Sequence, residues 1–240
     1  LRAGTSGPES NRIRGEVLPP EPGDVRDLPA LETERRDRLD ALGREAIAAG
    51  KVGIVTLAGG MATRFGGVVK AGVEALDGHS FLELKLLDVQ RLAELLDARI
   101  PAYLMTSFAT DAEVAQLAAT LTTDRVPVKS FPQYVSMRLT PEGALFRTDD
   151  HRVSCYAPGH GDLPMALRRA GALAQFRNAG GELLYMSNVD NLGATLDPAV
   201  IGFHLEAGQA VSAEGEDKLP GDKGGAPARV DGDLQIVEAF

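Results

Sequence analysis

The sequence has little cysteine, no long apolar run and no apolar core in its opening residues. Cys155 is the only cysteine in 240 residues, which excludes an internal disulfide and a zinc site built from several cysteines. We expect Cys155 to be a small buried apolar residue. No window approaches the roughly 18 consecutive apolar residues of a membrane span, and the opening LRAGTSGPES lacks a signal-peptide core. The sequence therefore predicts a soluble, cytoplasmic protein.

Basic side chains are also scarce. There are 25 Lys and Arg against 34 Asp and Glu, so the formal net charge is −9. Binding to a nucleic-acid backbone requires a basic stripe or patch, and a nucleic-acid partner is therefore not expected. The 240 residues, 44% of them hydrophobic, suffice for one large domain or two small ones. The composition leaves the oligomeric state open.

Residues 1–30 are rich in Pro, Gly and Arg and have no apolar period, which indicates a mobile arm without a fold of its own. Apolar residues then recur at helical spacing from Leu31 to Ala49, and Gly50 stands at the stop. The pattern predicts an amphipathic helix over 31–50. Residues 51–240 remain for the main domain.

This main domain alternates apolar runs with helical patterns. Continuous apolar runs predict strands over 52–58, 101–107, 126–131 and 182–191. Helical spacing predicts helices from about 80 to 97, from 110, from 162 to 180 and from 198 to 208. The alternation predicts an α/β fold with a mostly parallel or mixed sheet flanked by helices, whose ligands sit at the carboxyl ends of the strands.

Local residues suggest how these helices begin and end. Thr110 and Glu113 form a capping-box pattern, Asp162 is placed as an N-cap, and Asp197 and Gly208 stand at the two ends of the last helix. The final segment, 233–240, has the pattern of a strand. Taken as a parallel strand it needs cover on both faces, which predicts that the natural protein continues.

The segment LAGGMATRFGGVVK, Leu57 to Lys70, follows the first strand. Its four glycines let the backbone turn tightly and bring N–H groups against an anion, while Arg64 and Lys70 supply fixed charge. The segment therefore predicts a phosphate-binding loop. It is neither a Walker A motif nor the Rossmann G-x-G-x-x-G, and a glycine-rich turn with solvated cations is the alternative.

A second segment, Tyr156 to Pro164, reads YAPGHGDLP. Gly159 and Gly161 permit a close approach to a ligand, and His160 between them can donate or accept a hydrogen bond. A lone histidine is more often structural or solvated, so contact with a ligand is one of two readings.

A third segment, SNVDNLGATLDP, begins at a strand end. Alternation along a strand points Asn188 and Asp190 to the same side, above the sheet. One carboxylate with neutral oxygens suits Mg²⁺, which takes further ligands from substrate phosphates. The alternative is an Asx-rich turn that leads into a helix.

Two weaker features remain. Gln133 ends a strand with an amide that can pair with a base edge, although a surface Gln is commoner. Gly224 and Gly225 lie in the loop DKGGAP, which either holds substrate or turns the chain.

These motifs, in this order, resemble a known family. LAGGMATRFGG…K resembles the L-x-G-G-x-G-T-x-x-G…P-K signature of the sugar-nucleotide pyrophosphorylases. PGHGD, SNVDNLGATLD and KGG followed by LQIVE resemble the eukaryotic-type UTP–glucose-1-phosphate uridylyltransferases. The resemblance extends from Val52 to Glu238. UDP-N-acetylhexosamine pyrophosphorylases are similar, but their second signature is nearer to P-D-G-N-G-G, so PGHGD favours the glucose branch.

The resemblance implies a Rossmann-like nucleotide-diphospho-sugar transferase fold of GT-A type, with 51–240 as a nucleotidyltransferase domain truncated at its C-terminal end. It implies Mg²⁺ as cofactor, UTP and a hexose 1-phosphate as substrates, and UDP-glucose and pyrophosphate as products. The family also uses a second lysine, which would lie downstream of residue 240. The resemblance therefore implies that the isolated chain lacks part of its site.

The resemblance also implies a role for each motif residue. Nucleotide contacts are implied for Leu57, Ala58, Gly59, Gly60 and Lys70, uracil contacts for Gln133 and Gly159, sugar-phosphate contacts for His160, Asn188 and Gly225, a catalytic role for Lys70 and Arg64, and α-phosphate binding through Mg²⁺ for Asp190.

Two positions depart from the family pattern. Ala62 stands where the signature has glycine, and Val69 stands where it has the proline before lysine. They leave open a catalytically silent UDP-sugar-binding relative, and a UDP-N-acetylhexosamine or broad UDP-sugar pyrophosphorylase is the other alternative. A nicotinamide-dependent dehydrogenase is disfavoured because G-x-G-x-x-G is absent.

Overall fold

The computed structural model describes residues 12–62, 67–219, 221 and 224–238. The chain divides into two compact units. Unit 1 combines Leu1–Thr33 with Gln209–Phe240, and unit 2 is the continuous segment Glu34–Gly208. Unit 2 holds most of the expected motifs.

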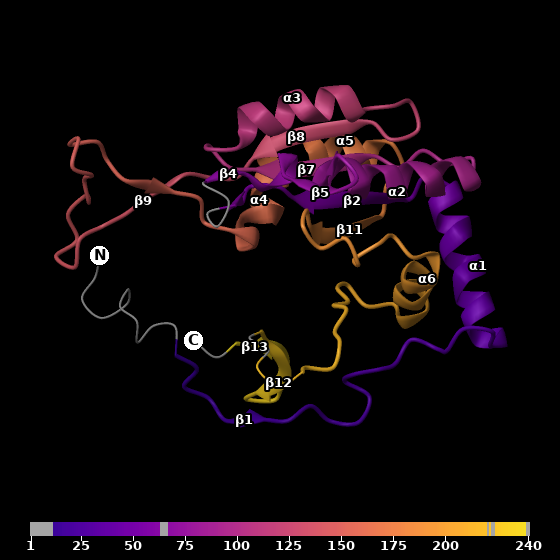
Figure 1. Cartoon of the computed structure of the whole chain (residues 1–240). Helices are drawn as coiled ribbons and strands as arrows, with labels where there is room; N and C mark the ends of the chain where they lie inside the picture. Colours follow the sequence, from indigo (N-terminus) through magenta and orange to yellow (C-terminus); the bar gives the residue numbers. More distant parts are fainter. Residues whose placement is uncertain (1–11, 63–66, 220, 222–223, 239–240) are drawn as a thin grey trace. The chain divides into compact units, whose positions relative to one another are not determined.

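Unit 2 is built on a four-stranded sheet. Its strands are β2 (Val52–Leu57), β7 (Ala102–Thr106), β8 (Val128–Pro132) and β11 (Leu183–Asn188). Their order is β11-β2-β7-β8, and every neighbouring pair is parallel (Figure 1). All residues of β7 are buried, as expected for a strand covered on both faces. The predicted parallel α/β sheet is confirmed.

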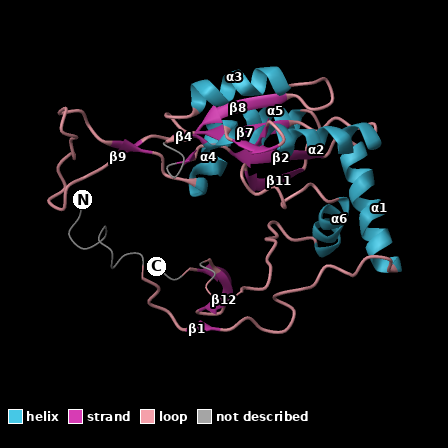
Figure 2. Cartoon of the chain, viewed as in Figure 1, coloured by secondary structure: helices cyan, strands magenta, loops and turns pink. Residues whose placement is uncertain are grey.

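Helices cover both faces of this sheet (Figure 2). The helices are α1 (Glu34–Ala48), α2 (Phe81–Leu95), α3 (Asp111–Leu121), α4 (Leu163–Arg169), α5 (Ala172–Asn178) and α6 (Pro198–Ala207). Ile54 and Leu104 pack in one core with residues of α2 and α3. Val55 and Tyr103 are the sequence neighbours of Ile54 and Leu104. They pack in a second core with residues of α4 and α5. Strand alternation thus separates the two cores.

Helices α1 and α6 touch through their backbones. A Cβ atom added at Gly43 would lie 1.8 Å from the Pro198 carbonyl oxygen, and one at Gly202 would lie 1.9 Å from the Leu39 carbonyl oxygen. Only glycine permits so close a crossing. As predicted, the Asp197 side chain caps α6 by accepting from the Ala199 N–H (2.8 Å), and Gly208 ends it with φ +62°.

Two predicted helix starts differ from the structure. Helix α2 begins with a capping box in which Ser80 and Glu83 exchange hydrogen bonds. The capping box predicted at Thr110 is wrong, because the Thr110 hydroxyl accepts from the Ser107 N–H (3.0 Å) and has no bond to the helix N-terminus. Asp162 stands at the N-cap position of α4, but its carboxylate accepts from the Tyr134 N–H (2.6 Å).

The single helix predicted over 162–180 is two helices. A short 3₁₀ turn, η4 (His160–Asp162), precedes α4, and Gly171 separates α4 from α5. Gly171 has φ +70°, in the left-handed region that glycine adopts readily. The chain therefore changes direction where the apolar pattern continues without interruption.

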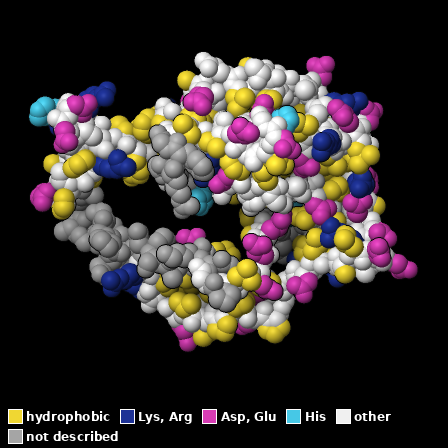
Figure 3. Space-filling model, in the orientation of Figure 1, with side chains coloured by type: hydrophobic (Ala, Val, Ile, Leu, Met, Phe, Trp, Pro, Cys, Tyr) yellow, Lys and Arg dark blue, Asp and Glu magenta, His cyan; other side chains and the backbone are white. Residues whose placement is uncertain are grey.

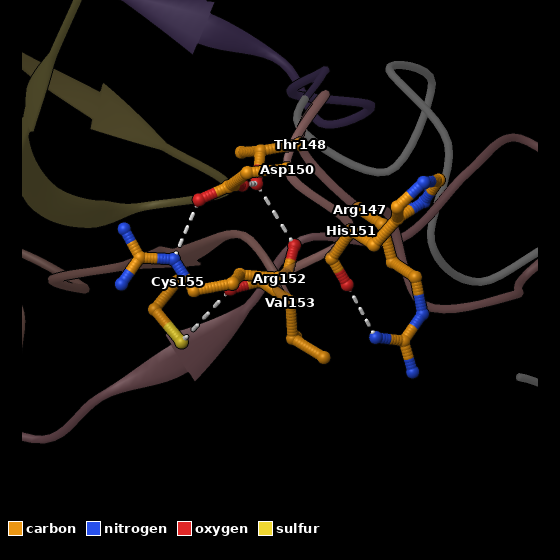
Figure 4. A network of polar contacts seen from close by, with 7 residues as sticks. All are labelled: Arg147, Thr148, Asp150, His151, Arg152, Val153 and Cys155. Carbon is orange, nitrogen blue, oxygen red and sulfur yellow. Dashed lines mark hydrogen bonds and ion pairs between the residues drawn. The ribbon is translucent and has the colours of Figure 1, made fainter.

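A two-stranded ribbon joins β8 to α4. Strands β9 (Ser136–Met137) and β10 (Cys155–Tyr156) pair antiparallel, and Figure 4 shows the polar contacts beyond them, including Arg152 Nε to Asp150 Oδ2 (2.6 Å). Cys155 is half-buried and its thiol donates to the Val153 carbonyl at 3.8 Å. The expected burial of Cys155 is wrong, because a two-stranded ribbon has no core to bury it.

Unit 1 contains an antiparallel sheet in the order β1-β12-β13. Its strands are β1 (Val17–Leu18), β12 (Ala226–Val230) and β13 (Asp233–Val237). The final predicted strand therefore exists, but it pairs antiparallel with β12 and most of its residues are exposed, so the cover expected for a parallel strand is not required. Within 1–30, where the sequence predicts no fold, residues 17–18 form β1.

Arg229 of β12 binds Asp24 through two nitrogens, Nε to Oδ2 at 2.8 Å and Nη2 to Oδ1 at 2.7 Å. The guanidinium holds the pKa of the Asp24 carboxyl below its ordinary value, chiefly by hydrogen bonding. No helix of the described residues is long and apolar enough to cross a bilayer. The cytoplasmic location stays a prediction.

Candidate nucleotide-binding site

The loop after β2 returns to the sheet beside its own start. After Ala58, whose N–H donates to the Met105 carbonyl (2.8 Å), the chain forms a hairpin of β3 (Met61–Ala62) and β4 (Val68–Val69). The Lys70 N–H then donates to the Gly60 carbonyl at 3.2 Å. The hairpin therefore places Lys70, the first residue of a 3₁₀ turn η3 (Lys70–Gly72), at the carboxyl end of β2.

Lys70 pairs with Asp190 at this end of the sheet. The ammonium Nζ lies 2.9 Å from Asp190 Oδ2, and the two side chains are 34% and 40% exposed. Asp190 follows β11, and the Val189 N–H donates to the Leu57 carbonyl. Strands β7 and β11 flank β2 on opposite sides, so the pair lies at the topological switch point, where open α/β sheets bind ligands.

A second group of residues lies at the ends of β7 and β8. Gln133 is 7% exposed. Its Nε2 donates to the Thr106 carbonyl (3.2 Å), and its Oε1 accepts from the Gly159 N–H (2.8 Å). A Cβ atom at Gly59 would lie 2.6 Å from Gln133 Nε2. The structure thus brings together Gly59, Gln133 and Gly159, which belong to three separate motifs.

Gly159 has φ +102°, a conformation that side-chain-bearing residues rarely adopt. It precedes His160, which is exposed at the start of η4. The Gln133 amide carries two N–H groups, of which the Thr106 carbonyl takes one. This corner therefore offers an amide donor and a histidine ring beside a backbone that can approach a ligand closely.

Asn188 and Asp190 are both exposed, and Val189 between them is 1% exposed. This agrees with the expected alternation. Asn191 forms the Asx turn, since its Oδ1 accepts from the Ala194 N–H (3.2 Å). The turn that was the alternative reading therefore accounts for Asn191 and leaves the Asp190 carboxylate facing Lys70.

A magnesium ion fits this site only as part of a complex with substrate. Within the described ranges, no three or more His, Cys, Asp or Glu residues form a group that could hold a metal. Asp190 offers one exposed carboxylate, and Asn188 offers a neutral oxygen nearby in sequence. Mg²⁺ commonly binds through one or two carboxylates and completes its shell with phosphates and water, so the donor set is compatible with it.

Two predicted site residues stand apart. Arg64 lies outside the described residues. Gly225 belongs to unit 1 and directly precedes β12, where an added Cβ atom would lie 2.3 Å from Ile236 Cγ2. Packing within the small sheet thus accounts for the glycine at 225, and its contact with a sugar phosphate stays a prediction.

The two departures from the family pattern fit the local backbone. Ala62 lies in β3 and pairs with Val68, in an extended conformation open to any residue. Val69 has φ −67° and ψ 117°, the angles that a proline would adopt. The valine therefore preserves the backbone geometry of the proline that the signature has there.

Lys85 is a site residue that the motifs did not reveal. It is 7% exposed in the middle of α2, and its Nζ donates to the carbonyls of Asn191 (2.6 Å) and Ala194 (2.7 Å). The loop that follows Asp190 is therefore fixed to α2. The signal in the sequence is a lysine on the apolar helix face, between the buried residues Leu82 and Val89.

Comparison with known proteins identifies the family. The model of the family described as UTP–glucose-1-phosphate uridylyltransferase matches residues 9–240. The chain belongs to this family. A UTP–glucose-1-phosphate uridylyltransferase of Saccharomyces cerevisiae is 33% identical over 193 residues, which are 78% of this chain and 39% of the yeast protein. A Dictyostelium discoideum member, UTP–glucose-1-phosphate uridylyltransferase 2, is 30% identical over 238 residues, 94% of this chain and 45% of its own.

Solved structures show the uridylyltransferase family's fold. A UDP-N-acetylglucosamine pyrophosphorylase of Trypanosoma brucei matches with a TM-score of 0.80 at 22% identity, over 92% of this chain and 49% of that one. A UDP-glucose phosphorylase of the same organism matches with a TM-score of 0.68 at 24% identity, over 92% and 47%. The predicted family and nucleotide-diphospho-sugar transferase-like fold are confirmed, while this family member spans less than half the length of the curated relatives above.

Proposed function

We propose that the chain forms the nucleotide-binding part of an enzyme that makes UDP-glucose and pyrophosphate from UTP and glucose 1-phosphate. The observation that carries the proposal is the Lys70–Asp190 pair at the switch point of the sheet. The group of Gly59, Gln133 and Gly159 at the ends of neighbouring strands supports it. Membership of the family supplies the reaction class.

The reaction needs no nucleophile from the protein, and it depends on how the two substrates are positioned. A phosphate oxygen of glucose 1-phosphate attacks the α-phosphorus of UTP in line, and pyrophosphate leaves. Two polyanionic substrates must approach each other in a protein of net charge −9. Cations close to the bound phosphates must therefore offset the electrostatic repulsion. At an effective dielectric constant of 20, two unit charges about 4 Å apart interact by ~4 kcal/mol, and surface acids beyond ~8 Å are screened.

In this proposal Lys70 turns from Asp190 to the UTP phosphates, and Arg64 is its candidate partner. Ala58, Gly60 and Leu57 form the loop against which the nucleotide lies. The second N–H of the Gln133 amide and the backbone at Gly159 hold the uracil edge, and His160 and Asn188 face the sugar phosphate. Each group binds or orients, so catalysis comes from preorganised charge.

Mg²⁺ is the proposed cofactor. Asp190 would hold it together with substrate phosphate oxygens, and the ion would supply neutralising charge at the α-phosphate. Before that, the Asp190 carboxylate must lose its ammonium partner. The proposal therefore assigns Asp190 two partners in succession, Lys70 in the free chain and the metal with bound nucleotide.

The test uses a full-length protein that contains this chain, with the 240-residue chain as a binding sample. Incubation of the full-length protein with UTP, glucose 1-phosphate and Mg²⁺ should release pyrophosphate, and the shorter chain should bind UDP-glucose. Lack of turnover with every common hexose 1-phosphate, despite UDP-sugar binding, would instead establish a silent binding relative.

We predict that glucose 1-phosphate is preferred over N-acetylglucosamine 1-phosphate, because PGHGD at 158–162 follows the glucose-branch signature. The measurement is kcat/KM for both sugars with the full-length protein, since their ratio is the specificity. A ratio in favour of the N-acetyl sugar would contradict the assignment and select the hexosamine branch.

A further inference from the structure

A cavity of about 540 Å³ lies at the other end of the sheet from the Lys70–Asp190 pair. It opens at the amino ends of β7 and β8 and beside the C-terminal half of α5. Its walls include Pro101, Tyr103 and Phe176, and its charged residues are Arg99 and Lys129. The proposed nucleotide site uses the carboxyl ends of the same strands, so the cavity has no part in it.

Tyr103 is the tyrosine that lines this cavity. It is 5% exposed, and its ring packs edge-on against Phe176 with 6.1 Å between the ring centroids. Its hydroxyl has no hydrogen-bond partner in the part of the chain that the structure describes. The hydroxyl is therefore free to bond a ligand in the cavity that Tyr103 lines.

The hydroxyl is a donor at neutral pH. Burial raises the pKa of Tyr103 above its ordinary value, while the positive charge of Arg99 acts in the opposite direction. A protonated phenol donates to an anionic oxygen and gains more from it than from a neutral one. Its position in the wall thus favours a negatively charged partner.

The charges of the cavity favour the same partner. Its lining holds two cations, Arg99 and Lys129, and no acid, although the chain as a whole is acidic. Lys129 is steadied by the Gln175 side-chain oxygen at 3.3 Å. Among the described residues Arg99 makes no ion pair, whereas the nearby Arg125 is paired with Asp97 at 2.7 Å.

We propose that this cavity binds a small organic anion. Its carboxylate or phosphate group lies between Arg99 and Lys129 and accepts from the Tyr103 hydroxyl, and its apolar part packs on Phe176 and Pro101. The volume suits one small molecule with a single ring. Binding there leaves the carboxyl ends of the strands open to nucleotide.

The experiment titrates the 240-residue chain with phenyl phosphate and, separately, with benzoate, by calorimetry. We expect saturable one-site binding of at least one of them, and the tighter of the two identifies the anionic group. Phenol, which lacks the charge, should bind at least tenfold more weakly. An excess of UTP should not displace the anion.

Variants assign the binding to this cavity. Arg99→Ala and Lys129→Ala should each weaken binding about tenfold, and Tyr103→Phe several-fold, because each removes a charge-assisted hydrogen bond. Arg125→Ala is the matched control, since it removes a neighbouring cation outside the lining, and it should leave the affinity unchanged. Thermal unfolding of each variant checks its fold, and the two exposed cations keep the test valid if Tyr103→Phe unfolds.

Three results would overturn the proposal. They are no saturable binding of either anion up to about 10 mM, binding that both Arg99→Ala and Lys129→Ala leave unchanged, and displacement of the anion by UTP. The last would place the anion in the nucleotide site instead. None of these results depends on turnover, so the proposal stands or falls separately from the proposed function.

Discussion

Lys70 is held in the free chain by the Asp190 carboxylate, to which the proposed function assigns Mg²⁺. The pair is exposed enough to contribute at most about 1 kcal/mol to stability. Exchanging it for a phosphate contact therefore costs little. At the scale of one residue, the ion pair keeps the ammonium at the strand end without binding it too tightly to release.

We expect Lys70→Ala and Asp190→Ala to lower the proposed activity of the full-length protein in different ways. Loss of the Lys70 charge should lower kcat about 100-fold, with no recovery in excess Mg²⁺. Loss of Asp190 should raise the Mg²⁺ concentration required and be partly relieved by more metal. Titration of Mg²⁺ against rate separates them. Lys51→Ala, which removes a surface partner of Glu182, is the control.

A near-normal rate and an unchanged metal dependence in Asp190→Ala would show that the metal assignment is wrong. The carboxylate would then be a partner of Lys70 alone. If Lys51→Ala lowered the activity as much as Lys70→Ala, the loss would not be specific to Lys70, and its proposed role would be wrong.

Gly59 and Gly60 offer a matched pair of substitutions. A Cβ atom at 59 would lie 2.6 Å from Gln133 Nε2, whereas one at 60 would lie 3.9 Å from Lys70 Cε. Gly59→Ala should therefore displace the Gln133 amide and weaken binding of UDP-glucose about tenfold or more, whereas Gly60→Ala should leave that amide in place and weaken binding less. Calorimetric titration of both variants gives the comparison, and equal affinities would exclude Gln133 from the uracil site.

At the scale of elements, the start of α2 makes stability depend on pH. The backbone N–H and hydroxyl of Ser80 lower the pKa of Glu83 below its ordinary value. A group with a lowered pKa in the folded state adds stability above its unfolded pKa, near 4.3, and loses it as the pH falls through the folded pKa. The cap should therefore be strongest at neutral pH.

We expect Glu83→Gln to lower the free energy of unfolding by about 0.5–1 kcal/mol at pH 7 and to have almost no effect near pH 3. Denaturant unfolding at both values measures the change. Asp88→Asn, an exposed acid on the same helix, should show no such dependence. A constant difference between Glu83→Gln and the parent chain would contradict the charged cap.

Where α1 and α6 cross, helix propensity and packing have opposite effects on the stability of a glycine-to-alanine variant. Alanine in place of a helical glycine usually stabilises by about 0.5–1 kcal/mol. At Gly43 and Gly202 the new Cβ atom would instead meet a carbonyl oxygen of the other helix at less than 2 Å. We expect Gly202→Ala to destabilise unit 2 by about 1–3 kcal/mol.

Denaturant unfolding of Gly43→Ala and Gly202→Ala tests this crossing. Gly215→Ala, which has no atom within 4 Å of its added Cβ, is the control and should leave the free energy of unfolding unchanged. If both helix variants had a higher free energy of unfolding than the parent chain, the close contact between α1 and α6 would not be needed for stability, and the prediction would be wrong.

The elements that sequence could predict are those whose residues act locally. The apolar runs of β2 and β7 and the cap of α6 by Asp197 needed no distant partner. The break at Gly171 could not be predicted, because glycine is tolerated within helices and the apolar spacing continues past it. Thr110 failed as a cap because Ser107, three residues earlier, took its hydroxyl.

The same distinction applies to the site. Lys70 and Asp190 were each predicted from their motif, but their contact spans 120 residues and depends on the order of the strands. The bond between Gln133 and Gly159 likewise needs the ribbon to return to the sheet. Lys85 was missed because its partners are backbone carbonyls, which no sequence pattern displays.

At the scale of the whole molecule, acidic side chains outnumber basic ones, 34 to 25. In the view of Figure 3, acidic and basic side chains are scattered among apolar and neutral ones. The cations of the proposed nucleotide site and of the anion-binding cavity therefore act through short range and not through a positive field over the surface. High salt should accordingly weaken both sites less than it would a long basic stripe.

The small antiparallel sheet has a consequence for the order of folding. Asp24 and Arg229, which form an ion pair in this unit, are 205 residues apart, and β1 pairs with β12 across a slightly longer interval. Every residue of unit 2 lies between them, so on a ribosome the parallel sheet emerges in full before β12 is available. Contacts this distant form slowly unless the intervening chain has already become compact. Unit 2 thus becomes compact first. Its folding brings residues 33 and 209 closer together, which speeds the pairing of β1 with β12.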